Sequence, residues 1–121
     1  MKHAYLVTLG LIAGFAAGCN TIADVTNSQS DAVTAATNAT CDRYDECGEI
    51  GAGKTYETRE SCENQVRDFW NDQWPASECE GHINGDALTV CTDRISSTAC
   101  DSFVDQLNTV YNSCSSDDVC R

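Results

Sequence analysis

A glycine-rich stretch, GEIGAGKT, has the residue types and spacing of a phosphate-binding loop. Two glycines five positions apart, followed by Lys54 and Thr55, match the pattern in which backbone amides surround phosphate groups. That chemistry requires a buried strand before the loop and a helix directly after it. The preceding residues, CDRYDEC, are charged and polar where such a strand would be rich in Val, Ile and Leu. We therefore predict a glycine-rich interhelical loop and no nucleotide binding.

Nine cysteines form the second group of reactive side chains. No two are spaced as C-x-x-C, which argues against a thioredoxin-like redox site and against a zinc ribbon. With Cys19 set aside, an even number remains, as is typical of a disulfide framework in a short exported chain. We predict structural disulfides among Cys41, Cys47, Cys62, Cys79, Cys91, Cys100, Cys114 and Cys120.

Helical geometry limits how these cysteines can pair. Cys100 and Cys114 would lie about 21 Å apart on one helix, which is beyond the reach of a disulfide. Cys41 and Cys47 point to different sides of a continuous helix and should join different elements. The one pairing we expect is Cys47 with Cys62, which would close the glycine-rich loop by joining the end of the first helix to the start of the second.

Other side chains with catalytic or ligating potential are few. His82 is the only histidine outside the N-terminal segment, and no nucleophile elbow or pair of metal ligands accompanies it. An exposed loop histidine is therefore favoured over a hydrolase that uses His82 with Asp86 or a serine. The acids Asp42, Asp45 and Glu46 could hold Ca²⁺, but no calcium-binding loop surrounds them. We predict no catalytic residue, no metal site and no cofactor.

Trp70 and Trp74, one helical turn apart and next to Phe69, form the densest aromatic group. Small disulfide-rich domains need large apolar anchors, so core packing is the favoured role. If either tryptophan were exposed instead, it would mark a contact with a ligand or a partner.

The N-terminus has the composition of an export signal. Residues 1–18 carry Lys2 and then the apolar run AYLVTLGLIAGFAAG, which is short for a membrane span. The sequence AAGC, ending at Cys19, resembles a bacterial lipobox. This resemblance implies that the signal is cleaved and that Cys19 carries the lipid. The alternative is an ordinary secretory signal with an incidental cysteine.

Lipidation at Cys19 would place the protein outside the cytoplasm, anchored to a membrane through several acyl chains. Aspartate after the acylated cysteine marks inner-membrane retention in some bacteria, so Asn20 favours the outer membrane, with the domain facing the periplasm or the surface. Lysine and arginine number 7 against 19 acidic residues, and the net charge is −12. Nucleic acid and anionic lipid headgroups would be repelled by such a chain.

Residue spacing after the anchor predicts an all-α domain of about four helices. Residues 19–30 are expected to be the acylated cysteine and a flexible tether, and residues 31–121 the disulfide-stabilised domain. The first helix should begin after a cap at Ser30 and stop at Gly48, and the second should run from a cap at Thr58 through Trp74.

The C-terminal region has weaker helix signals. Pro75 should end the second helix or begin a short turn around Cys79. Asp86 is expected to cap a third helix. Thr98 and Asp101 resemble a capping box that opens a fourth helix running to Cys114.

Three segments carry a family resemblance: CDRYDECGEIGAGKTY, ESCENQVRDFWNDQWPASECEG and INGDALTVCTDRISSTAC. Together with the lipobox they resemble a family of small cysteine-rich bacterial lipoproteins that carry the label of natural-product biosynthesis. The resemblance covers about residues 41–120. It implies a lipid-anchored, disulfide-rich domain associated with secondary metabolism, and it implies no reaction and no catalytic residue.

The expected function is that of a non-enzymatic, lipid-anchored binding or accessory protein of the cell envelope. Its partner would be a small molecule or another envelope protein. An enclosed pocket would favour the small molecule and a flat apolar patch the protein. The alternatives are an extracytoplasmic enzyme that uses His82 with a carboxylate, and a structural spacer that has neither pocket nor patch.

Overall fold

The structure, a computed structural model, describes residues 27–120. The predicted export signal (1–18) and the predicted lipidation site, Cys19, lie outside the described residues. Within them the chain forms four longer helices, two single-turn helices and one 3-10 turn. They are α1 (Gln29–Glu46), α2 (Arg59–Gln73), α3 (Ala76–Cys79), α4 (Gly85–Ser96), α5 (Phe103–Tyr111), η2 (Asn112–Cys114) and α6 (Ser116–Val119). The predicted class, a small disulfide-rich all-α domain, is confirmed.

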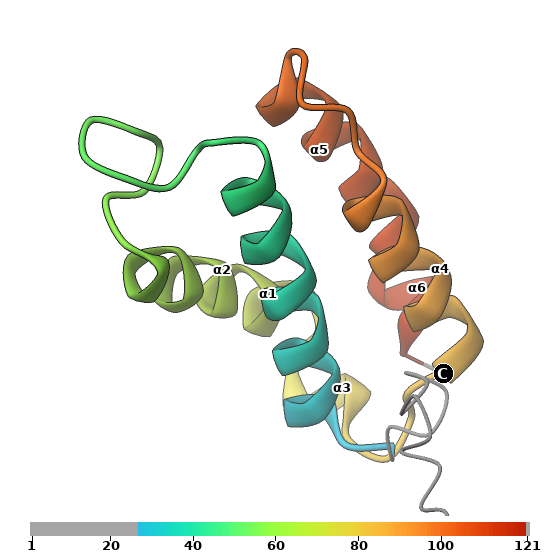
Figure 1. Ribbon diagram of the computed structural model, residues 1–121. Coiled ribbons are helices and arrows are strands. Elements are labelled where there is room, and N and C mark those ends of the chain that lie inside the picture. The colour runs from blue at the N-terminus through green and yellow to red at the C-terminus, as the bar shows by residue number, and fades with distance from the viewer. Residues whose placement is uncertain (1–26, 121) are drawn as a thin grey trace, which may run out of the picture.

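Helix α1 lies at the centre of the molecule (Figure 1). Helix α2 crosses one side of α1, and α4 packs along the other side. Helices α4 and α5 run in opposite directions as a hairpin, and η2 and α6 return the chain along α4. The apolar face of each longer helix packs against the neighbouring helices, and the buried residues form one continuous core.

The first helix begins two residues earlier than predicted. Its cap is Ser28, whose hydroxyl accepts the amide of Asp31 at 3.3 Å, so the expected cap at Ser30 is wrong. The physical reason is Gln29, which is buried and donates its side-chain amide to the carbonyl of Trp74 at 2.6 Å. This long-range contact holds the first turn of α1 against the end of α2.

The second helix follows its prediction closely. The hydroxyl of Thr58 accepts the amide of Ser61 at 3.1 Å, which confirms Thr58 as the cap. Pro75 then stands directly before α3, the predicted turn around Cys79, where the missing proline amide costs nothing.

The predicted start of the fourth helix is wrong. Thr98 and Asp101 form no capping box, because the Thr98 hydroxyl donates to the carbonyl of Arg94 at 2.9 Å and so closes α4. Helix α5 begins only after Ser102, which adopts a left-handed conformation with φ of 51°. Cys100 therefore lies in the connection between the helices. The expected cap of α4 is also displaced, since Asn84 and not Asp86 accepts the amide of Ala87.

All of the predicted disulfide cysteines are paired. The expected pairing of Cys47 with Cys62 is wrong, because Cys62 faces Cys41 on α1 while Cys47 reaches the connection after α4. Cys41 and Cys47 do join different elements, and Cys100 and Cys114 do pair elsewhere, as predicted. The four bridges are Cys41–Cys62, Cys47–Cys100, Cys79–Cys120 and Cys91–Cys114. This framework indicates an oxidising compartment outside the cytoplasm.

Candidate functional site

The glycine-rich loop is an interhelical connection, as predicted, and it has no phosphate-binding geometry. Helix α1, not a strand, leads into it, and α2 begins only at Arg59. Two of its amides are used within the loop: Gly51 N–H donates to the carbonyl of Tyr56 at 2.8 Å, and Lys54 N–H to that of Gly51 at 3.1 Å. These two amides therefore do not point together as the amides of a phosphate-binding loop do.

The tryptophans lie in the core. Trp70 and Trp74 are fully buried, and their rings stack with centroids 4.6 Å apart. Each indole N–H has an internal acceptor, the hydroxyl of Thr40 at 3.3 Å and the carbonyl of Cys114 at 2.9 Å. The exposure that would have made either tryptophan a ligand or partner contact is therefore not found.

The remaining candidates are not assembled into a reactive site. His82 is exposed, and no hydrogen bond within residues 27–120 joins its ring to Asp86 or to a serine. Asp42 pairs with Arg59 at 2.7 Å across α1 and α2, which is a surface ion pair. In the described part of the chain, no three His, Cys, Asp or Glu side chains converge as a metal site would require.

Two tyrosines, Tyr44 and Tyr111, have raised pKa values. Burial, followed by the neighbouring phenol of Tyr56 and the carboxylate of Glu49, raises the pKa of Tyr44 to about 12. Burial likewise raises the pKa of Tyr111. Both rings pack against other aromatic side chains, Tyr44 within the core and Tyr111 half-buried against it, and both phenols are held in the neutral form.

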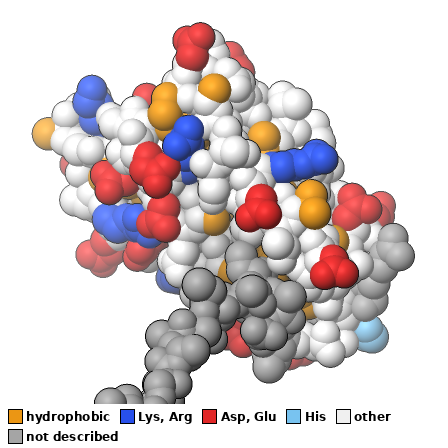
Figure 2. Space-filling model, turned by 45° about the vertical axis from the view of Figure 1, so that its right-hand side comes forward, with side chains coloured by type: hydrophobic (Ala, Val, Ile, Leu, Met, Phe, Trp, Pro, Cys, Tyr) orange, Lys and Arg blue, Asp and Glu red, His pale blue; other side chains and the backbone are white. Residues whose placement is uncertain are grey.

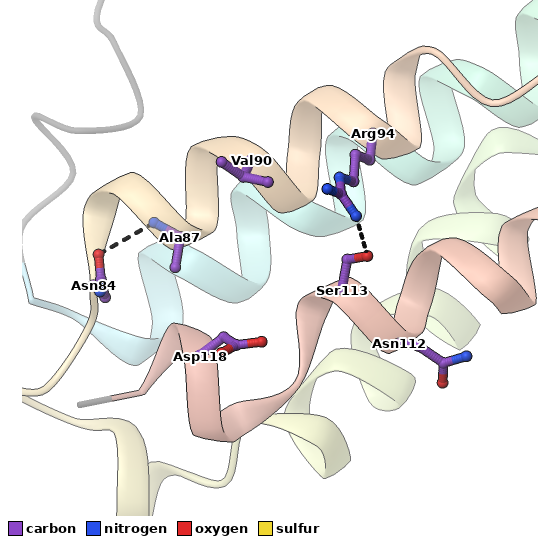
Figure 3. A pocket seen from close by; sticks show the side chains of 7 residues that line it. All are labelled: Asn84, Ala87, Val90, Arg94, Asn112, Ser113 and Asp118. Atoms are coloured by element: carbon purple, nitrogen blue, oxygen red, sulfur yellow. Dashed lines mark hydrogen bonds between the residues drawn. The ribbon is translucent and has the colours of Figure 1, made fainter.

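A groove of about 470 Å³ runs between α4 and the C-terminal segment (Figure 3). We name it the α4 groove. Its lining residues are Asn84, Ala87, Val90, Arg94, Asn112, Ser113 and Asp118. It is within the size range of small-molecule sites. A second hollow of about 420 Å³ begins on the other side of Arg94 and extends between the end of α4 and α5.

Backbone contacts and disulfides fix the two walls of the α4 groove. Asn84 N–H donates to the carbonyl of Val119 at 2.7 Å, which places α6 level with the first turn of α4. The Cys91–Cys114 disulfide ties the middle of α4 to η2. The wall residues therefore belong to a cross-linked scaffold, which keeps their relative positions largely preformed.

The groove contains one cation and one anion. The guanidinium of Arg94 donates to the hydroxyl of Ser113 at 2.5 Å, and the hydroxyl of Ser115 donates to Oδ2 of Asp118 at 3.2 Å. No ion pair joins Arg94 to Asp118 in the part of the chain that the structure describes. Between them lie the methyl of Ala87 and the side chain of Val90, which is 48% exposed.

No broad apolar patch competes with this groove. Among the described residues, the large hydrophobic side chains that are exposed are Val90 and Val104. Figure 2 shows one face of the molecule on which acidic side chains are spread widely and hydrophobic ones occur singly. None of the helices in residues 27–120 has the length and apolar composition needed to cross a membrane.

Sequence reasoning missed the groove, although it contained one usable signal. Arg94 is the only lysine or arginine between residues 68 and 120, a stretch that is otherwise acidic and neutral. It lies one turn after Val90, on the exposed side of α4 next to the buried face formed by Leu88, Cys91 and Ile95. A lone cation beside an apolar residue on a solvent-facing helix is the pattern that could have indicated the site.

The family model described as a family of unknown function (DUF6184) matches residues 41–121. The match includes the eight disulfide cysteines and every residue that lines the α4 groove. No curated protein and no solved structure matches the chain.

Proposed function

The chain belongs to the DUF6184 family of unknown function, and from that premise we propose that it is a lipid-anchored envelope protein that binds a small molecule in the α4 groove without chemically changing it. The observation that carries this proposal is the groove itself, which holds a cation, an anion and an apolar floor on a cross-linked scaffold. A few polar groups around apolar surface is the usual composition of a ligand site.

The anchor in this proposal rests on the sequence. The lipobox-like AAGC would place the lipid on Cys19, and Asn20 favours the outer membrane, with the domain in the periplasm or at the surface. The disulfides support the oxidising side of the inner membrane. The resemblance to lipoproteins labelled for natural-product biosynthesis supports a secreted small molecule as the ligand.

The binding alternatives have less support. An envelope protein as the main partner would need an apolar contact surface, and the exposed large hydrophobics, Val90 and Val104, stand on separate helices. A hydrolase would need His82 within reach of a carboxylate or a serine, and such a contact is not found among the described residues.

The test begins with the mature protein purified from its native membrane. Mass spectrometry should find acyl groups on Cys19, and a protein that retains residues 1–18 without lipid would contradict the anchor. The same protein in nanodiscs is then incubated with secreted metabolites of the producing cells, and retained compounds are identified by mass spectrometry.

Two variants make the binding test specific. Arg94→Gln removes the groove cation, and Arg67→Gln removes an exposed arginine from α2, away from the groove. We expect a compound that the natural chain and Arg67→Gln retain and that Arg94→Gln releases. If no compound is retained, or if both variants retain it equally, the groove is not a ligand site and a structural spacer becomes the better account.

A further inference from the structure

The two charged groups of the α4 groove, Arg94 and Asp118, lie toward different ends of the groove, and none of the ion pairs within residues 27–120 joins them. We propose that the ligand is a zwitterion of short-peptide type, with its anionic end at Arg94, its cationic end at Asp118 and an apolar middle over Ala87 and Val90. This inference rests on the proposed function and names the chemical class that the groove selects.

The Arg94 end is suited to a carboxylate or a similar planar anion. One of its N–H groups donates to Ser113, and no described carboxylate pairs with it. A guanidinium has five donors in a fixed fork, so several remain for a ligand. The Ser113 contact also holds the side chain toward η2, as Figure 3 shows, and thereby reduces the entropy lost on binding.

The Asp118 end is suited to an ammonium group. Its carboxylate accepts one hydrogen bond from Ser115, and an ionised carboxylate has further acceptor positions. Asn84 lies at the same end, since α6 is bonded to the start of α4 through Val119.

The rise along α4 indicates the length of ligand that the groove can hold. Ala87, near the Asp118 end, and Arg94 are seven positions apart, which corresponds to about 10 Å along the helix axis. A peptide of three residues spans about 10 Å when extended. A ligand that carries both charges can pair with Arg94 and Asp118 at once, whereas a ligand with a single charge would leave one of these groups unpaired.

Trialanine and its two blocked forms test this inference directly. Trialanine carries both charges, N-acetyl-trialanine only the carboxylate, and trialanine amide only the ammonium group. Each is titrated into the mature lipidated protein in nanodiscs of zwitterionic lipid, and the backbone amide shifts of residues 84–94 and 112–118 are followed by NMR. We expect saturable shifts with trialanine and at least about tenfold weaker binding of either blocked form.

The variants assign each end of the ligand. Arg94→Gln should weaken trialanine and leave trialanine amide unchanged, because that probe already lacks the carboxylate. Asp118→Asn should weaken trialanine and leave N-acetyl-trialanine unchanged, and Arg67→Gln should alter none of the three. Equal binding of the three probes, a swapped response of the two variants, or the absence of groove shifts with trialanine would overturn the inference.

The outcome is separable from that of the proposed function. If a secreted metabolite binds in an Arg94-dependent manner while trialanine does not, the groove is a ligand site and the zwitterion assignment fails. If neither binds, both proposals fail together.

Discussion

The N-terminal and C-terminal halves of the described chain are built differently. In the α1–α2 half, residues 29–73, two long helices are joined by the buried Cys41–Cys62 disulfide, and Trp70 fills the space between them. In the C-terminal hairpin, residues 85–119, the helices shorten toward the C-terminus, and two hollows flank Arg94 on the outer side. One disulfide, Cys91–Cys114, lies wholly inside this second half.

This contrast shows how a small chain can maintain an open groove. A domain of this size has a modest core, and a groove leaves apolar surface exposed to water that would stabilise the fold if it were buried. In the α1–α2 half the largest fully buried side chain is Trp70, whereas the C-terminal hairpin buries Leu88, Ile95 and Leu107 and is cross-linked by its own disulfide. The groove can therefore persist because the buried side of the hairpin and the Cys91–Cys114 disulfide hold its two walls.

The largest expected effect comes from Trp70→Ala in the α1–α2 half. Loss of a fully buried indole leaves a cavity between α1 and α2, and truncations of this kind cost about 3–5 kcal/mol of the free energy of unfolding. Urea denaturation followed by far-UV circular dichroism measures the cost. Val90→Ala truncates a half-exposed side chain that lines the groove, and it should change stability by less than about 0.5 kcal/mol. Equal costs for the two would remove the distinction between the buried contact of α1 with α2 and the open groove.

The second test compares two buried disulfides of similar loop length. Cys41–Cys62 and Cys91–Cys114 have sequence separations of 21 and 23, so the loop-entropy contribution is nearly the same for both. Replacing either pair by alanine should cost about 2–4 kcal/mol in urea denaturation.

The two disulfides should differ in what their loss does to the groove. Without Cys91–Cys114, we expect η2 to separate from α4 and the amide NMR signals of residues 112–118 to lose dispersion. Without Cys41–Cys62, those signals should remain, because the disulfide lies in the other half. Intact groove signals in both variants would show that the hairpin holds itself together without the bridge.

The contrast between the halves also separates what could be predicted from what could not. The second helix could be predicted because its signals are local: Thr58 caps it, and Trp70 and Trp74 repeat at helical spacing. The pairing of Cys47 could not, since sequence distance favoured Cys62 while the fold brings the end of α1 to Cys100. The start of α5 was missed for a similar reason, because Ser102 adopts a conformation that usually belongs to glycine.

The groove lies beyond local prediction because its charged ends come from separate elements. Arg94 is on α4 and Asp118 on α6, and their register is set by long-range contacts, among them the backbone bond between Asn84 and Val119 and the Cys91–Cys114 disulfide. Local patterns report which face of a helix is apolar. They do not report which later segment will lie beside it.

The smallest expected effect is a decrease in folding stability at alkaline pH, caused by Tyr44 at the junction of the two halves. Tyr44 on α1 packs against Tyr56 of the glycine-rich loop and Phe103 at the start of α5, with ring centroids 5.0 and 4.8 Å apart. Its pKa is raised to about 12 in the folded protein, from an ordinary value near 10 in the unfolded chain. Between these values the unfolded chain releases a proton that the folded protein keeps. Stability from this group is therefore complete below about pH 10 and declines as the pH rises toward 12.

Tyr44→Phe isolates that contribution, because it keeps the ring and removes the ionisable hydroxyl. Urea denaturation at about pH 8 and at about pH 11 should show a smaller alkaline loss for Tyr44→Phe than for the natural chain. Part of the loss should persist, since burial raises the pKa of Tyr111 as well, and that ring contacts Phe69 and Trp70 of α2. If Tyr44→Phe and the natural chain lose stability equally, the junction does not exclude water from Tyr44, and the halves are less tightly joined than the ring contacts indicate.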